Sequence, residues 1–242
     1  MIDNRLETFP KNDTALVSRL CDRKFGIGAD GLILIEPDKN SDFEMIYYNS
    51  DGRPGTMCGN GGRCAVAFAK RLGMVQNSAR FNAADGIHHA EILADGNIAL
   101  RMQDVDSVQK KDTGWFVDTG SPHHIEMVNG LEGFDVFTRG SQIRHNVYGE
   151  QGSNVNFVEQ RGADQFFVRT FERGVEDETF SCGTGATAVA LAMYDQGLAG
   201  STSISIRVPG GSLMVTFDKI GTTYTNIVLS GPAELVFDGT LS

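Results

Sequence analysis

The chain carries one sequence pattern twice, once around Cys58 and once around Cys182. Residues 43–73 read FEMIYYNSDGRPGTMCGNGGRCAVAFAKRLG, and residues 166–197 read FFVRTFERGVEDETFSCGTGATAVALAMYDQG. Aligning the two cysteines without a gap also aligns three pairs of glycines, namely Gly59 with Gly183, Gly61 with Gly185 and Gly73 with Gly197. Two segments rich in Gly and Ala can match by chance, but the shared spacing on both sides of the cysteine favours a duplicated domain.

Each copy predicts the same local structure. Residues 43–48 and 166–171 are rich in aromatic and β-branched side chains, which is typical of a strand. A polar loop and the motif C-G-x-G follow, and then a stretch that is apolar on nearly every face, which predicts a buried helix. Gly73 and Gly197 stand where a left-handed residue commonly follows the end of a helix. Each predicted helix therefore begins at Cys-Gly.

A cysteine at a helix start is suited to acid–base chemistry. The unpaired backbone N–H groups of the first turn stabilise a thiolate and bind a carboxylate, and the following glycine leaves room for close approach. If two such elements meet one substrate, a thiolate removes the α-proton from one face while a thiol protonates the other, which inverts the stereocentre. The alternative is that Cys58 and Cys182 are buried structural thiols. For Cys64 and Cys21 we expect packing roles, Cys21 in a helical segment that starts near Asp13.

Composition excludes several functions. The 242 residues carry a formal net charge of -10, and no basic cluster relieves it, so a nucleic-acid partner is not expected. No apolar run approaches the roughly 20 residues that span a bilayer, and the start MIDNRLETF does not resemble a secretory signal. We therefore expect a cytoplasmic protein with no membrane partner.

The sequence shows no motif for a cofactor or a metal. The four cysteines contain no C-x-x-C pair, so the commonest zinc signature is missing. The glycines of F-G-I-G-A-D-G, residues 25–31, lack the spacing of a nucleotide-binding loop, so we predict a tight turn before a strand at 32–35. Cofactor-free chemistry without a metal is the expectation.

The motifs N-S-D-G, C-G-N-G-G-R-C and E-R-G-V-E-D-E-T-F-S-C-G-T-G resemble those of the diaminopimelate epimerase family, and the similarity runs over nearly the whole chain. The resemblance implies a pyridoxal-phosphate-independent isomerase that interconverts L,L- and meso-diaminopimelate for lysine and peptidoglycan synthesis. It implies that Cys58 and Cys182 are the two acid/base thiols and that His123 lies near the reactive centre. The substrate-binding residues that it implies are Asn49, Gly59, Asn60, Asn154, Glu172, Arg173, Gly183 and Thr184.

The sequence departs from the family pattern at three places. The chain begins at MIDNR, where the family's opening G-x-G-N-D-F-type segment should have ended, so we expect a strand and one Asn contact to be missing. Ser121 stands where the family often has Asn, and Gly31 where some members have a substrate-binding Gln. Two functional alternatives therefore stay open: another cofactor-independent racemase, similar to proline racemase, and a binding protein of the same fold with impaired catalysis.

The predicted architecture is α+β, with two similar domains related by a pseudo-twofold axis. Each domain is expected to be a curved mixed β-sheet or barrel around a central buried helix. The first domain covers residues 1–114, and the resemblance implies that a last strand near residues 232–237, within 228–242, returns to it. The second domain covers residues 115–227. The oligomeric state is left open, with a homodimer as one alternative.

Overall fold

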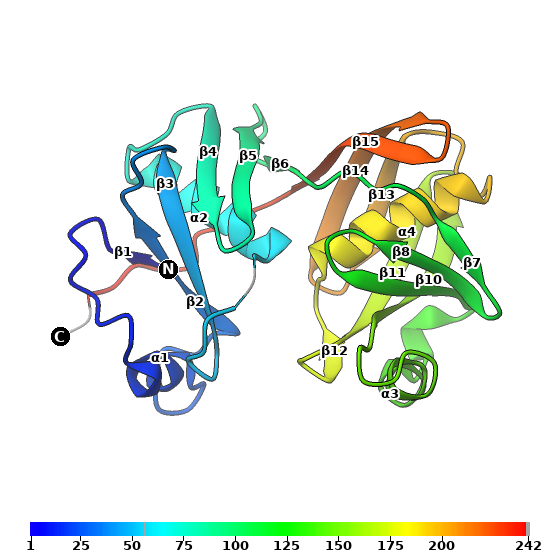
Figure 1. Ribbon diagram of the computed structural model, residues 1–242, viewed down its shortest axis with the longest axis horizontal. Helices are drawn as coiled ribbons and strands as arrows, with labels where there is room; N and C mark the ends of the chain where they lie inside the picture. Colours follow the sequence, from blue (N-terminus) through cyan, green and yellow to red (C-terminus); the bar gives the residue numbers. More distant parts are fainter. Residues whose placement is uncertain (56, 241–242) are drawn as a thin grey trace. The chain divides into compact units, whose positions relative to one another are not determined.

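The computed structural model describes residues 1–55 and 57–240, and the chain forms two compact units (Figure 1). Unit 1 contains Met1–Leu100 and the C-terminal segment from Pro232, and unit 2 contains Arg101–Gly231. The boundary lies between residues 100 and 101, not between 114 and 115 where the sequence analysis placed it. The reason is that residues 102–105 are held by unit 2: Met102 N donates to Ile227 O at 2.8 Å, and Val105 pairs with Tyr224.

Unit 1 is a mixed sheet with two helices. Its strands pair in chain order and are β1 (Ile2–Asp3), β2 (Gly31–Glu36), β3 (Phe43–Asn49), β4 (Ser78–Ala83), β5 (Gly86–Ile92) and β6 (Ile98–Arg101). Helix α1 (Thr14–Cys21) connects β1 to β2, and helix α2 (Gly59–Arg71) connects β3 to β4. The pairings are parallel for β1–β2 and β3–β4, and antiparallel for β2–β3, β4–β5 and β5–β6.

Unit 2 repeats this plan and adds a hairpin. Its paired strands, in spatial order, are β7 (Gln109–Lys111), β8 (Gly114–Asp118), β9 (Pro122–Met127), β10 (Asn154–Gly162), β11 (Gln165–Glu172), β13 (Ser203–Val208), β14 (Gly211–Ile220) and β15 (Thr223–Gly231). The short strand β12 (Asp177–Thr179) pairs with β11. A 3-10 turn (Leu131–Gly133) and helix α3 (Val136–Asn146) connect β9 to β10, and helix α4 (Gly183–Asp195) lies between β12 and β13.

The two units share one sequence of strand pairings. From β9 to β15 the pairings are parallel, antiparallel, parallel, antiparallel and antiparallel, which is also the order from β1 to β6. The central helices α2 and α4 begin and end at positions that the cysteine alignment makes equivalent. The prediction of an α+β protein with two similar domains is confirmed.

The ends of the central helices match in detail. Gly73 and Gly197 have φ of 73° and 70°, in the left-handed region predicted from the sequence. Met74 N donates to Ala69 O, and Leu198 N donates to Met193 O, each at 3.0 Å. These six-residue closures satisfy carbonyls that a helix end leaves unpaired, and glycine adopts the required positive φ without strain.

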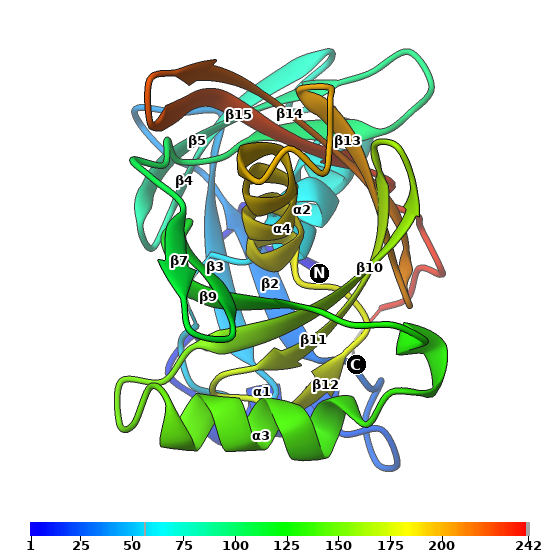
Figure 2. The same cartoon turned by 90° about the vertical axis from the view of Figure 1, so that its right-hand side faces the viewer.

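The sheet of unit 2 separates two apolar cores. Alternate residues of a strand face opposite sides, so Val158, Phe166 and Val168 pack against α4, which is buried over most of its length. Their neighbours Val155, Phe157 and Phe171 pack on the other side, in the core that α3 closes. Figure 2 shows α4 surrounded by the strands of its unit and α3 outside them.

Two expectations were wrong. Helix α2 is buried along one side only, because Cys64, Ala67 and Phe68 are half-buried and Lys70 is exposed. The C-terminal segment does return to unit 1, where Arg71 pairs with Asp238, but residues 232–240 form no strand. The side chains of Leu235, Val236 and Phe237 are exposed, so this segment lacks the burial that would hold it as a strand.

None of the helices in the described residues is both long enough and apolar enough to cross a bilayer.

The packing of α3 on β11 generates a stability prediction. A Cβ placed on Gly140 would lie 2.4 Å from Phe171 Cβ, and Phe171 is almost fully buried. Gly140→Ala should therefore lower the free energy of unfolding by about 1–3 kcal/mol, because overpacking outweighs the helix propensity of alanine. Urea unfolding measures the change. The matched control is Gly133→Ala, where a Cβ meets no atom within 4 Å. Equal stabilities of the two variants would contradict this account.

Candidate active site

Cys58 and Cys182 occupy the same position in their units. Each is the residue that precedes the first helical turn, with φ and ψ of -114° and 130° at Cys58 and -117° and 110° at Cys182. Their carbonyls accept the first helical hydrogen bonds, from Gly62 N at 2.8 Å and from Ala186 N at 2.9 Å. Both thiols are half-buried, and Cys182 Sγ lies 3.4 Å from Thr184 Oγ1. The duplicated sequence thus places two equivalent sulfurs at two helix starts.

Helices α1 and α3 begin differently. Asp13 accepts a hydrogen bond from Leu16 N at the start of α1, and Asp135 accepts one from Thr138 N at the start of α3. An aspartate at this position caps the N–H groups of the first turn, and its negative charge offsets the partial positive charge of the helix start. The pair Cys-Gly at α2 and α4 supplies no carboxylate, so these two helix starts are suited to receive an anionic ligand.

The third residue of each central helix is glycine, and the first turn packs closely on its sheet. A Cβ on Gly61 would lie 3.1 Å from both Ile33 Cδ1 and Met45 Cε. A Cβ on Gly185 would lie 2.4 Å from Asn156 Oδ1 and 3.3 Å from Cys182 Cβ. The surface beneath the helix start is therefore apolar in unit 1 and polar in unit 2.

In unit 1 a buried guanidinium organises the first turn of α2. Arg63 is 5% exposed, and it donates to Gly59 O at 3.3 Å and to Asn60 Oδ1 at 2.8 Å. Burial lowers the pKa of Arg63, and its interactions with Cys64 and Cys58 act in the opposite direction. The equivalent residue of unit 2 is Thr187, whose Oγ1 donates to Gly183 O at 3.0 Å. One helical carbonyl is thus held from the same position by a cation in one unit and by a hydroxyl in the other.

In unit 2 the inner face of the sheet becomes polar at one end. His123 lies beside Asn154 on the parallel strands β9 and β10, and Thr170 and Glu172 lie on β11. Asn154 accepts from Arg173 N at 2.9 Å and donates to Ser121 Oγ at 2.9 Å. Through Asn154, these bonds join the end of β11 to the start of β9.

The charged pair at the end of β11, Glu172 and Arg173, is held by its neighbours. Thr179 Oγ1 donates to Glu172 Oε1, and Arg173 Nη1 donates to Gln151 O at 2.9 Å. Glu172 is half-buried and Arg173 is exposed. The carboxylate and the guanidinium therefore lie at the end of the strand that precedes the Cys182 loop, with the guanidinium open to solvent.

His123 is the most strongly perturbed group of this region. Its side chain is fully buried, and burial lowers its pKa from 6.5 to about 3, with Arg173 acting in the same direction. The imidazole is therefore neutral around pH 7. Asn156 Nδ2 lies 3.1 Å from His123 Nδ1.

The predicted site residues fall into two sets, one in each unit. Unit 1 contains Cys58, Gly59 and Asn60 at the start of α2, and Asn49 exposed at the end of β3. Unit 2 contains His123, Asn154, Glu172, Arg173, Cys182, Gly183 and Thr184. Of the remaining cysteines, Cys21 is buried and Cys64 is half-buried, and burial raises the pKa of both thiols.

Sequence reasoning missed Asn156 and Thr170 and undervalued Ser121. Both missed side chains are buried on the inner face, two residues along the strand from Asn154 and from Glu172 respectively. A period of two along each strand was the available signal, because residues i and i+2 face the same side.

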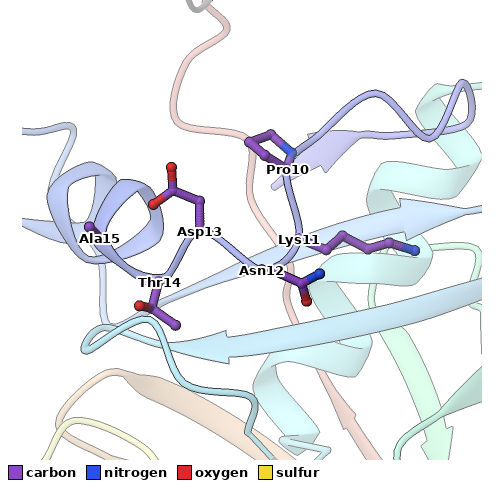
Figure 3. Close-up of a pocket in the computed structure, with 6 residues that line it drawn as sticks. All are labelled: Pro10, Lys11, Asn12, Asp13, Thr14 and Ala15. Carbon is purple, nitrogen blue, oxygen red and sulfur yellow. The ribbon is translucent and has the colours of Figure 1, made fainter.

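A separate hollow of about 510 Å³ is lined by Pro10–Ala15 in unit 1 (Figure 3). In Figure 3 the side chain of Asp13 lies at the start of α1, and the side chain of Lys11 points away from Asp13. Since the Asp13 carboxylate caps α1 and Lys11 pairs with Glu36 at 2.8 Å, these charges serve the fold. None of the predicted site residues lines this hollow. In the described part of the chain, no three His, Cys, Asp or Glu side chains gather in a way that would hold a metal ion.

Comparison with known proteins agrees with this geometry. The sequence profile of the family described as diaminopimelate epimerase matches residues 1–108 and 115–236. The diaminopimelate epimerase of Flavobacterium psychrophilum is 55% identical over 242 residues, covering 100% of this chain and 94% of that protein. The diaminopimelate epimerase of Chlorobaculum tepidum is 44% identical over 251 residues, covering 100% of this chain and 96% of that protein.

Solved structures share the fold at low sequence identity. A phenazine biosynthesis protein of the PhzF family from Bacillus anthracis has a TM-score of 0.71 at 14% identity, over 95% of this chain and 88% of that one. A probable proline racemase from Agrobacterium radiobacter K84 has a TM-score of 0.68 at 16% identity, over 96% of this chain and 83% of that one.

Two α+β units, each with a cysteine at the start of its central helix, define an isomerase of the racemase and epimerase class. Within this class, the profile match and the identity to curated relatives are specific. The chain belongs to the diaminopimelate epimerase family.

The burial of His123 predicts a pH dependence of stability. Below pH 6.5 the unfolded chain binds a proton at this residue, whereas the folded protein does not until about pH 3. Its contribution to stability is therefore complete above pH 6.5 and is lost as the pH falls toward 3, by up to about 1.4 kcal/mol per pH unit. Urea unfolding between pH 4.5 and 7.5 should show a shallower pH dependence for His123→Gln than for the unmodified protein. The control is His89→Gln, at an exposed position of β5, which should leave the pH dependence of stability unchanged. A His123→Gln profile parallel to that of the unmodified protein would disprove the burial effect.

Proposed function

We propose that this protein is a diaminopimelate epimerase, which interconverts the L,L- and meso-isomers of diaminopimelate with Cys58 and Cys182 as its acid/base pair. The observation that carries the proposal is the matched geometry of the two cysteines, each preceding the first turn of an equivalent helix. Its family membership and the names of its curated relatives support the same substrate.

The proposed reaction moves one proton to and from one carbon. The thiolate of one cysteine takes the α-proton and becomes a thiol, and the electron pair of the broken C–H bond delocalises into the substrate carboxylate. The thiol of the other cysteine then protonates the opposite face and becomes a thiolate. The mechanism requires that both sulfurs reach the same carbon. Backbone N–H groups of the two helix starts stabilise the charge that develops on the carboxylate.

The remaining residues are proposed to bind the substrate. Gly59 with Asn60 and Gly183 with Thr184 receive the carboxylate of the reacting end. Asn49, Asn154, Glu172 and Arg173 recognise polar groups, because Arg173 can grip a carboxylate and Glu172 can accept from an ammonium. A substrate with an amino group and a carboxylate at each end suits this set better than a cyclic amino acid does. We place His123 near the reactive centre.

The setting of the proposed reaction follows from the same reasoning. The enzyme works without a cofactor or a metal, in the cytoplasm, on a small molecule that feeds lysine and peptidoglycan synthesis. The net charge of -10 favours neither a nucleic-acid nor a membrane partner.

Cysteine substitutions test the mechanism. Cys58→Ala and Cys182→Ala should each lower epimerisation of L,L-diaminopimelate by roughly 10²–10⁴-fold or more, because each removes one acid/base group. Cys64→Ala is the control and should retain most of the activity. Turnover is followed in deuterium oxide, where the α-position of the product gains deuterium. Normal epimerisation by the Cys182 variant would refute the scheme.

The same assay separates the alternatives. L-proline, offered in place of diaminopimelate, should show no exchange. Exchange with proline would point to another racemase, and no exchange with either compound would point to a binding protein.

A redox experiment tests whether the two sulfurs approach each other. Diamide takes up two electrons and two protons when two thiols join as a disulfide, which needs Cα atoms roughly 4.4–6.8 Å apart. We expect inactivation, a Cys58–Cys182 linked peptide in the mass spectrum, and recovery with dithiothreitol. The Cys64→Ala variant should behave like the unmodified protein. A linkage through Cys64 instead would contradict the proposed pairing.

A further inference from the structure

Asn156 lies directly beneath the residues that follow Cys182, and the proposed function gives it no role. Its side chain is fully buried on the inner face of β10. Its Oδ1 is the atom nearest to a Cβ built on Gly185, at 2.4 Å, and Cys182 Cβ and Sγ are both 3.3 Å from the same point. Asn156 therefore contacts the first turn of α4 at the reactive cysteine.

Two hydrogen bonds fix which way the Asn156 amide points. Its nitrogen is 2.9 Å from His124 O, a carbonyl that can only accept, so this atom must be the N–H donor. On the other side, Thr170 Oγ1 donates to Asn156 Oδ1 at 3.0 Å. A flipped amide would place two acceptors together at His124, so the orientation follows from the partners.

This orientation determines the proton position on His123. The second N–H of Asn156 lies 3.1 Å from His123 Nδ1, so Nδ1 must accept. A neutral imidazole with an accepting Nδ1 carries its proton on Nε2. His123 is neutral around pH 7 because the ring is fully buried. The Nε2–H group is buried and has no hydrogen-bond partner within residues 1–55 and 57–240.

We propose that Asn156 is a positioning residue, which together with Thr170 holds His123 as the neutral Nε2–H tautomer and so makes it a hydrogen-bond donor instead of a proton-accepting base. The catalytic part of this inference rests on the proposed function, whereas the tautomer does not. In many proteins, a hydrogen bond to one ring nitrogen of a functional histidine determines whether the other nitrogen carries a proton.

The tautomer is measured directly by NMR of the 15N-labelled protein, in spectra that correlate the ring protons of His123 with its two nitrogens. The unmodified protein should carry its proton on Nε2. In Asn156→Asp a carboxylate oxygen replaces the donor, so the proton should move to Nδ1. Asn77→Asp, at an exposed position just before β4 in unit 1, is the matched control and should leave His123 unchanged. A proton on Nδ1 of the unmodified protein would overturn the proposal, as would an unaltered tautomer in a folded Asn156→Asp variant.

Activity separates a donor from a base. Glutamine offers an N–H near the place of Nε2–H but cannot take up a proton, and leucine does neither. His123→Gln should therefore keep at least ten times the kcat of His123→Leu, and Asn156→Asp should lower kcat roughly 10–100-fold with little change in KM. Equal loss in the Gln and Leu variants would show that His123 is not a donor. If the unmodified protein does not epimerise diaminopimelate, the proposed function fails, and the NMR measurement still decides the tautomer.

Discussion

The close packing of a glycine-rich first turn on a sheet is the constraint on which both halves of this protein depend. A Cβ would lie 2.4 Å from Asn156 Oδ1 at Gly185 and 3.1 Å from two apolar side-chain ends at Gly61, so the helix starts lie close against their strands. A cysteine precedes each turn where α1 and α3 use aspartate, and sulfur is a weaker acceptor than a carboxylate. The missing cap costs helix stability, commonly about 1 kcal/mol, and the deep burial of α4 offsets it. As a result, the partial positive charge at each of these helix starts is not neutralised by a carboxylate and lies beside a thiol.

Duplication preserved the backbone of the two units and changed the side chains beneath the thiols. Arg63 and Thr187 bond equivalent carbonyls, yet one is a buried cation and the other is neutral. Apolar Ile33 lies under the first turn of α2, and polar Asn156 lies under that of α4. Symmetric thiols suit proton transfer to either face of a carbon. A substrate with one long side chain is not symmetric about its α-carbon. Its recognition therefore requires that the side chains around the two thiols differ between the units.

The repeat in the sequence predicted the central helices, their start at Cys-Gly and the left-handed glycines after their ends, because these features depend on local backbone geometry. It did not predict the unequal burial of α2 and α4, which depends on what each unit packs around its helix. The strand expected at 232–237 fails because ladder bonds and burial decide strands, and sequence pattern alone supplies neither. Asn156 and Thr170 escaped notice because their importance comes from the register in which β10 pairs with β11 and β9, which a local pattern does not give. The site residues themselves came from family resemblance more than from local pattern.

The polar end of the unit 2 sheet lowers the stability of the fold, because it contains a buried N–H group without a hydrogen-bond partner among the residues that the structure describes. A buried donor without a partner destabilises a protein by about 1–3 kcal/mol, and the imidazole of His123 carries one at Nε2. The neighbouring side chains of Asn156 and Thr170 do not share this deficit, because they hydrogen-bond to one another and Asn156 also donates to His124 O. An apolar residue in place of His123 would remove this deficit. Folds that violate a packing rule at one place while satisfying it around that place commonly do so at functional sites. The unsatisfied N–H of His123 therefore marks one place where unit 2 gives up stability, on the sheet face that also carries Asn156.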